Sequence, residues 1–178
     1  MSTELSMENR VVFITGGGRG IGRGITARFV EQGAKVFICG RNEPEDMPEG
    51  VTFLACDVRD ADAVGKVVQK VAADAGRLDV VINNAGGAPF AEAATASPRF
   101  SEKIIQLNLI AALHVSQAAN AVMQAQDDGG VIINVASVSG TRPSPGTAAY
   151  GAAKAGLLNL TSSLAVEWAP KVRVVAVT

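Results

Sequence analysis

The chain reads VVFITGGGRGIGRGITARFVEQG at residues 11–33, and this stretch decides the fold. Its first five residues, 11–15, are β-branched or aromatic, which predicts a buried strand. Apolar residues then recur every three or four positions, which predicts a helix over residues 20–32, and Gly33 is a typical stop signal. A glycine-rich turn separates the two elements. A strand, a glycine turn and a helix in this order indicate an α/β fold built on a parallel sheet.

The same alternation continues along the chain and predicts a three-layer, Rossmann-type, doubly wound parallel sheet with helices on both faces. One connection differs, because residues 40–50 contain two prolines and several acids, so we expect a loop or a single turn there instead of a helix. Further strands are expected at 35–39, 51–55, 78–82, 131–135 and 172–177, and further helices at 60–75, 101–126 and 148–168.

The length of 178 residues predicts a single domain over residues 1–178. Sixteen Lys and Arg against 17 Asp and Glu give a net charge of −1, which disfavours nucleic acid and anionic membranes as partners. The sequence contains no run of about 18 apolar residues, so no membrane span is predicted. The first ten residues do not resemble a signal peptide, so we expect a cytoplasmic protein.

Two cysteines, Cys39 and Cys56, are too few for a disulfide framework and indicate a reducing compartment. Buried thiols are the favoured interpretation over a redox or metal role. The single histidine, His114, has no ligand partners at suitable spacing, so no metal site is predicted.

The turn after the first strand has the spacing Gly-x-x-x-Gly-x-Gly at Gly16, Gly20 and Gly22, and it does not satisfy the strict GxGxxG spacing. Backbone N–H groups of such a turn can approach a pyrophosphate, and the helix N-terminus adds a favourable dipole. The alternative is a turn needed only for tight packing of the strand against the helix. The strand before it and the helix after it favour dinucleotide binding.

The end of the second strand bears on which dinucleotide binds. An acidic residue there would accept the ribose hydroxyls of NAD, whereas this chain has Gly40 followed by Arg41. A guanidinium suits a ribose 2′-phosphate, and Arg19 in the glycine turn can approach the same group. NADP(H) is therefore favoured over NAD(H), although either arginine can also be a solvated surface charge.

Tyr150 and Lys154 lie four residues apart on an expected helix, so their side chains share one face. Such a pair alone is usually a surface pair, but Ser137 lies just beyond the fifth strand, at the edge where open parallel sheets bind ligands. A neighbouring ammonium lowers the pKa of a phenol from its usual value of about 10, which makes Tyr150 a candidate general acid/base. Ser137 can hydrogen-bond the same substrate oxygen. Asn108 is a polar residue between two leucines of the long helix, so it has either a functional role or a structural one in capping a kink.

Six motifs, in this order, resemble the short-chain dehydrogenase/reductase family over essentially the whole chain: TGGGRGIG at 15–22, CDV at 56–58, NNAG at 83–86, LNL at 107–109, ASVSG at 136–140 and YGAAK at 150–154. The resemblance implies a catalytic tetrad of Asn108, Ser137, Tyr150 and Lys154. In it Tyr150 is the acid/base, Lys154 lowers its pKa and binds the nicotinamide ribose, Ser137 orients the substrate oxygen, and Asn108 holds a proton-relay water.

The resemblance also implies where the cofactor lies. Asp57 and Val58 match the family's adenine contact, the segment after the fourth strand lies beside the adenosine ribose, and Thr15 ties that segment to the turn. Together with the two arginines, the expected cofactor residues are Thr15, Gly16, Gly18, Arg19, Gly20, Ile21, Gly22, Arg41, Asp57, Val58, Asn84, Ala85, Gly86, Tyr150 and Lys154.

The expected activity is an NAD(P)(H)-dependent oxidoreductase that interconverts a secondary alcohol and a ketone, with a 3-oxoacyl-type or other small carbonyl as substrate. Family members are commonly dimers or tetramers, so a homodimer or homotetramer is expected. The sequence ends at Thr178, directly after the sixth expected strand, whereas the family continues with a Pro-Gly turn, a substrate lid and a final strand. The chain therefore looks C-terminally incomplete, and the alternative is a dinucleotide-binding module without turnover.

Overall fold

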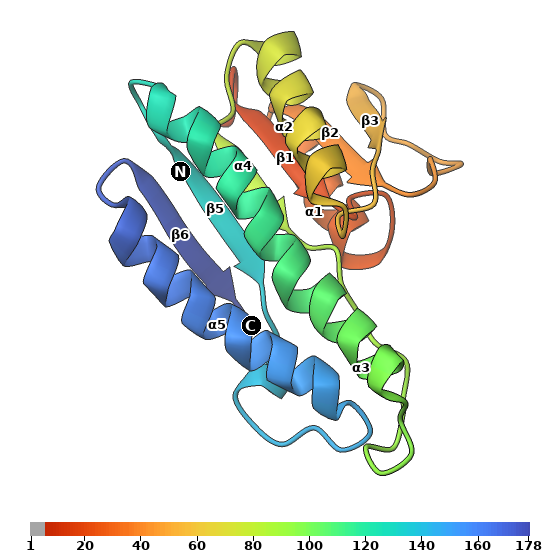
Figure 1. Ribbon diagram of the computed structural model, residues 1–178. Coiled ribbons are helices and arrows are strands. Elements are labelled where there is room, and N and C mark those ends of the chain that lie inside the picture. Colours follow the sequence, from red (N-terminus) through yellow and green to blue (C-terminus); the bar gives the residue numbers. More distant parts are fainter. Residues whose placement is uncertain (1–5) are drawn as a thin grey trace, which may run out of the picture.

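Six parallel strands form one sheet in the order β3-β2-β1-β4-β5-β6 (Figure 1). The structure is a computed structural model that describes residues 6–178. The order reverses direction between β1 and β4, which creates the switch point at which open α/β sheets bind ligands. The predicted doubly wound α/β fold is confirmed. The strands are β1 (Val11–Thr15), β2 (Lys35–Gly40), β3 (Val51–Ala55), β4 (Val80–Asn83), β5 (Gly130–Val135) and β6 (Val172–Val177).

The helices lie on both faces of this sheet, as Figure 1 shows. One face is covered by α2, α4 and α5, and their side chains share a core with Phe13, Phe37 and Ile132 of the strands. The other face is covered by α1, whose Ile25 and Phe29 pack on the strand cluster there. The helices are α1 (Gly20–Glu31), α2 (Ala61–Ala75), α3 (Pro98–Ile105), α4 (Ala111–Ala125) and α5 (Ala148–Trp168).

Burial differs between the central strands and β6. All five residues of β1 are buried, as expected for a strand covered on both faces. Along β6, burial alternates: Val172 and Val174 are buried, whereas Val175 and Val177 are 42% and 51% exposed. Burial is therefore complete on both faces of β1, whereas one side of β6 is exposed.

The connection from β2 to β3 is a loop, as predicted, with turns and bends but no helix between residues 41 and 50. It still contacts the body of the fold, because Met47 packs on the apolar cluster beneath α1. Pro44 lies directly against the backbone of Gly18, in the turn after β1. The loop therefore forms one wall beside the glycine turn.

Two element boundaries differ from the sequence prediction by more than one residue. β4 begins at Val80 instead of residue 78. The Asp79 carboxylate, directly before it, accepts hydrogen bonds from the Val11 amide at 2.8 Å and from Arg10 and Arg77 at 2.6–2.9 Å. The long helix begins at Pro98, where the Ser97 hydroxyl caps the first turn.

That long helix is also interrupted in its middle. Between α3 and α4, the segment η1 (Gln106–Ile110) is a π-helical turn, which the sequence did not predict. Such turns are rare and occur frequently at functional sites. Within the described residues 6–178, no helix is both long and apolar enough to cross a membrane.

Candidate active site

The turn after β1 and the segment after β4 form one hydrogen-bonded unit. The Thr15 hydroxyl oxygen accepts the amides of Asn84 and Ala85, each at 3.0 Å. The Asn84 side-chain amide donates to the carbonyl oxygens of Thr15 at 2.9 Å and Gly16 at 3.1 Å. The structure thus joins the ends of β1 and β4 through residues that the sequence assigned to cofactor binding.

The glycine turn is tight because backbone atoms occupy the space of missing side chains. Gly16 and Gly20 have φ values of +66° and +52°, which only glycine adopts without strain. A Cβ at Gly22 would overlap the Gly16 carbonyl oxygen and the Asn84 amide. The turn therefore brings its backbone to the strand edge more closely than any other residue type would permit.

The first turn of α1 is left open for an anion. Its N-cap is Arg19, whose side chain makes no capping hydrogen bond, and the first turn holds no acidic residue. Ile21 is 72% exposed, so no other part of the described chain covers this end. The free N–H groups and the positive end of the helix dipole suit a phosphate.

We predict that Gly22→Ala lowers the free energy of unfolding by about 1–3 kcal/mol, because the added methyl group forces the turn open. Gly24→Ala is the matched control on the same helix: a Cβ there meets nothing within 4 Å. It should raise stability by about 0.5–1 kcal/mol, as Gly→Ala does in an open helix interior. Urea unfolding of both variants measures the difference, and equal effects would show that the turn is not tightly packed.

Tyr150 and Lys154 lie one turn apart on α5, as predicted, with the Lys154 Nζ 5.7 Å from the centre of the Tyr150 ring. Lys154 is only 4% exposed, and its ammonium donates to the Val135 carbonyl oxygen at 2.6 Å. Burial lowers the pKa of Lys154 to about 8. A buried cation is thereby held between the end of β5 and the phenol ring.

Asn108 lies within the π-helical turn and is 1% exposed. Its side-chain oxygen accepts the Gly87 amide at 2.7 Å, and its Nδ2 donates to the carbonyl oxygens of Gly87 and Ile104, each at 2.9 Å. A Cβ at Gly86 would lie 2.6 Å from the Asn108 oxygen and 3.6 Å from the Lys154 Nζ. The structure thus brings Gly86, Asn108 and Lys154 together.

Both N–H groups of the Asn108 amide are used in these contacts, so this side chain fixes the segment after β4 to the π-helical turn. The geometry supports a positioning role for the side chain. It does not show an Asn108 side chain free to hold a relay water.

Ser137 follows β5 and begins the short 3₁₀ segment η2 (Val138–Gly140), where its hydroxyl accepts the Ser139 amide at 3.1 Å. A Cβ at Gly140 would lie 2.8 Å from the Ala155 amide nitrogen, so η2 packs against α5 beside Lys154. Further along the loop, the hydroxyl of Ser144 lies 3.1 Å from that of Ser139 and 2.6 Å from that of Thr147. This hydroxyl chain, which the sequence analysis missed, stiffens the loop before Tyr150.

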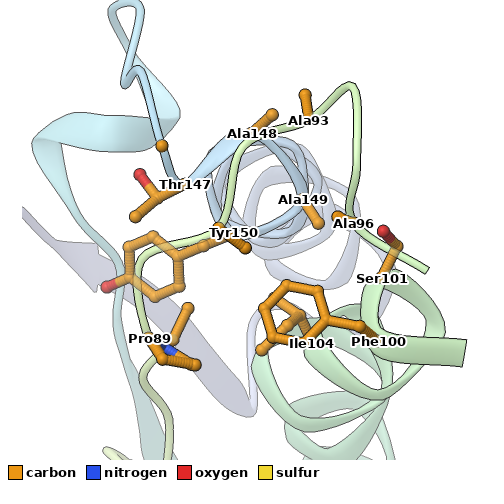
Figure 2. Close-up of a pocket in the computed structure, with 13 residues that line it drawn as sticks. Pro89, Ala93, Ala96, Phe100, Ser101, Ile104, Thr147, Ala148, Ala149 and Tyr150 are labelled. Atoms are coloured by element: carbon orange, nitrogen blue, oxygen red, sulfur yellow. The ribbon is translucent and has the colours of Figure 1, made fainter. Parts of the chain in front are cut away.

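A cavity of about 70 Å³ lies beside Tyr150, between the loop after β4, helix α3 and the start of α5. Its wall is mainly alanine, proline and larger apolar side chains. Figure 2 shows the Tyr150 ring facing Pro89, with Phe100 and Ile104 on the other side and the hydroxyl end turned away from them. The cavity is small, its wall exposes polar and apolar atoms in similar amounts, and the acid/base candidate forms part of that wall.

The two arginines that the sequence predicted to bind the cofactor lie at the carboxyl edge of the sheet, in the turns after β1 and β2. Arg19 and Arg41 are exposed, and neither side chain makes a hydrogen bond or ion pair within residues 6–178. Val58 is buried beneath the same edge.

Arg59, which the sequence analysis did not single out, binds the carboxylate of Asp57. These arginine contacts lower the pKa of Asp57, the largest effect being the hydrogen bond from Arg59.

A buried polar chain beneath the site was also missed. The Asn83 amide donates to the Ser116 hydroxyl at 2.9 Å and to the Asn134 oxygen at 2.8 Å, and the Asn134 amide donates to the Thr161 hydroxyl at 2.9 Å. The four residues are at most 6% exposed and come from α4, β4, β5 and α5. A polar residue in each buried apolar run was the signal that would have found them.

Comparison with known proteins identifies the family. The family model described as short chain dehydrogenase matches residues 10–178. The chain belongs to the short-chain dehydrogenase family. It is 36% identical over 170 residues to the 3-oxoacyl-(acyl-carrier-protein) reductase FabG of Chlamydia muridarum, covering 89% of this chain and 68% of that protein.

Solved structures of short-chain dehydrogenases agree with this fold. A short chain dehydrogenase from Bacillus anthracis superposes with a TM-score of 0.89 at 34% identity, covering 96% of this chain and 76% of that one. An NAD⁺-bound xylitol dehydrogenase gives a TM-score of 0.89 at 29% identity, covering 97% and 70%. The predicted family and the general class, an oxidoreductase of this family, are confirmed.

Proposed function

We propose that this short-chain dehydrogenase interconverts a secondary alcohol and a ketone with NADP(H), using Tyr150 as the general acid/base. The observation that carries the proposal is the buried ammonium of Lys154, held 5.7 Å from the Tyr150 ring at the carboxyl edge of the sheet. A buried lysine costs stability, and such groups concentrate at functional sites.

Each of the four catalytic candidates has a separate role in the proposed reaction. Tyr150 donates a proton to the ketone oxygen in reduction and removes it from the hydroxyl in oxidation. Ser137 hydrogen-bonds the same oxygen, which orients the carbonyl and stabilises its developing charge. Lys154 keeps positive charge beside the phenol, and Asn108 fixes the wall formed by Gly86. A bound nicotinamide dinucleotide supplies or accepts the hydride.

The described residues fit such a dinucleotide. The closely packed glycine turn and the uncapped start of α1 form a cradle for a pyrophosphate. Asn84, Ala85 and Gly86 continue this cradle towards Tyr150, and Asp57 and Val58 lie at the adenine end. NADP(H) is proposed over NAD(H) because Arg19 and Arg41 offer unpaired guanidinium groups at that end.

A 3-oxoacyl-type or other small carbonyl is the proposed substrate class. The small cavity beside Tyr150, whose wall exposes both polar and apolar atoms, suits a small carbonyl compound with a short alkyl part, and a relative 36% identical to this chain is named as a 3-oxoacyl-(acyl-carrier-protein) reductase.

The test is a fluorescence titration of the protein with NADPH and NADH, followed by an assay of NADPH oxidation with a panel of small 3-oxoacyl esters and ketones. We expect tighter binding of NADPH and turnover of at least one ketone. Binding without any turnover would favour a dinucleotide-binding module, and binding of neither cofactor would overturn the proposed site.

We predict that Arg41→Ala weakens NADPH binding about tenfold and leaves NADH binding unchanged, because only NADPH carries the 2′-phosphate. The same titrations measure both dissociation constants. Arg28→Ala, which removes an exposed arginine paired with Glu31 on α1, is the matched control and should change neither. An equal loss for both cofactors would contradict the 2′-phosphate role of Arg41.

A further inference from the structure

Arg59 holds Asp57 by four hydrogen bonds just after β3. The Arg59 amide donates to the Asp57 Oδ1 at 3.1 Å, and its Nε donates to Oδ1 at 2.9 Å and to Oδ2 at 3.2 Å. The Nη2 donates to Oδ2 at 2.5 Å, which completes a two-pronged contact between guanidinium and carboxylate. Both groups are partly exposed, with side chains 31% and 35% accessible, so a ligand can reach the pair.

This pair lies beside the two strands that frame the adenosine end. The amide of Cys56, directly before Asp57, donates to the Gly40 carbonyl oxygen at 2.8 Å, directly before Arg41. The positive charge of Arg41 also reaches the Asp57 carboxyl, whose pKa is lowered mainly by the hydrogen bond from Arg59 and further by Arg41. Asp57, Arg59 and Arg41 therefore form one electrostatic group.

The charge balance of this group depends on Arg59. With Arg59 bound, the carboxylate of Asp57 is compensated and Arg41 contributes a net positive charge. Without Arg59, Asp57 would be a free anion facing Arg41, and it would compete with any anionic ligand for that guanidinium.

We propose that Arg59 is a further specificity residue: by compensating the charge of Asp57, it keeps Arg41 available for an anionic phosphate on the ribose of an adenine nucleotide. The inference rests on the proposed function, because it takes the ends of β2 and β3 as the adenosine site. Arg59 acts through Asp57 and does not itself need to touch the phosphate.

The test compares adenosine 2′,5′-bisphosphate with 5′-AMP by calorimetric titration, using the wild type and Arg59→Gln. The first nucleotide carries the 2′-phosphate and the second lacks it. We expect Arg59→Gln to weaken binding of the bisphosphate about tenfold and binding of 5′-AMP less than twofold, with a difference that shrinks at high salt. Arg28→Gln, an exposed arginine paired on α1, is the matched control and should change neither.

The double variant Asp57→Asn/Arg59→Gln separates this mechanism from a merely structural role. Removing the uncompensated carboxylate should restore most of the preference for the bisphosphate over 5′-AMP, a ratio in which any contact of Asp57 with the adenine of both ligands cancels. No recovery would overturn the inference and would mean that Arg59 contacts the phosphate directly or only supports the loop. Equal binding by wild type and Arg59→Gln would overturn it while the proposed function stands, whereas a wild type that binds neither nucleotide would overturn the dinucleotide site itself.

Discussion

Replacing Tyr150 by phenylalanine is expected to lower kcat by about 10²–10⁴-fold and to leave NADPH affinity within about twofold. The phenol ring forms part of the wall of the small cavity and keeps its place in the variant, so the change removes the hydroxyl and little else. Without that proton donor, the oxygen of the reduced carbonyl must take its proton from water. Steady-state rates with NADPH and a ketone, together with a fluorescence titration of the cofactor, measure the two effects.

Ser162→Ala is the matched control for this variant. Ser162 is exposed on the same helix, and its hydroxyl donates only to the Leu158 carbonyl oxygen at 3.3 Å. Its removal should leave kcat unchanged. A Tyr150→Phe protein with wild-type kcat would refute the acid/base assignment, whereas a protein that also loses NADPH binding would show that the ring supports the cofactor site.

Replacing Lys154 by methionine is expected to abolish turnover and yet to stabilise the protein by about 2 kcal/mol at pH 7. Burial lowers the pKa of Lys154 to about 8 from an ordinary 10.5, so removing the ammonium gains about 3 kcal/mol. Loss of the hydrogen bond to the Val135 carbonyl oxygen lowers the stability by about 1 kcal/mol, so the net gain is about 2 kcal/mol.

The pH dependence of unfolding tests the same group. Between pH 8 and 10.5 the unfolded wild type holds more protons at Lys154 than the folded form does, so this lysine makes the unfolding free energy rise with pH across that window. In Lys154→Met this rise is absent, and its stability advantage therefore disappears towards pH 10.5. Urea unfolding at several pH values gives the difference between the two proteins.

Lys70→Met provides the control for this series, because Lys70 is exposed on α2 and pairs only with Asp74. It should follow the wild-type curve within about 0.5 kcal/mol at every pH. A Lys154→Met protein that is less stable than the wild type at pH 7 would show that the contact with Val135 outweighs the cost of burying the charge.

Much of the fold could be predicted from the sequence because its signals are local. The apolar run at 11–15 and the glycines after it determine the first strand and turn without reference to any distant residue. The spacing of Tyr150 and Lys154 likewise fixes their common helix face. Their position at the carboxyl edge of β5 followed from the alternation of strands and helices, which leaves few topologies for a parallel sheet.

Features set by distant contacts could not be predicted. The π-helical turn at Asn108 depends on hydrogen bonds to Gly87, 21 residues away, and helical periodicity carries no sign of them. The ion pair of Asp79 with Arg10, 69 positions earlier in the chain, leaves no local sequence signal either. Nothing in the sequence singles out Arg59, and only its four hydrogen bonds to Asp57 do so.

The buried chain from Ser116 through Asn83 and Asn134 to Thr161 makes four positions interdependent. Each hydrogen bond has its partner on a different element, so a single apolar replacement leaves a polar group stranded without water, whereas replacing neighbouring members together removes donor and acceptor at once. In a combinatorial library that randomises all four, the surviving sequences should therefore be correlated in pairs. Engineering of this protein must change these residues together, since their hydrogen bonds connect helix α5, which carries Tyr150, to the sheet.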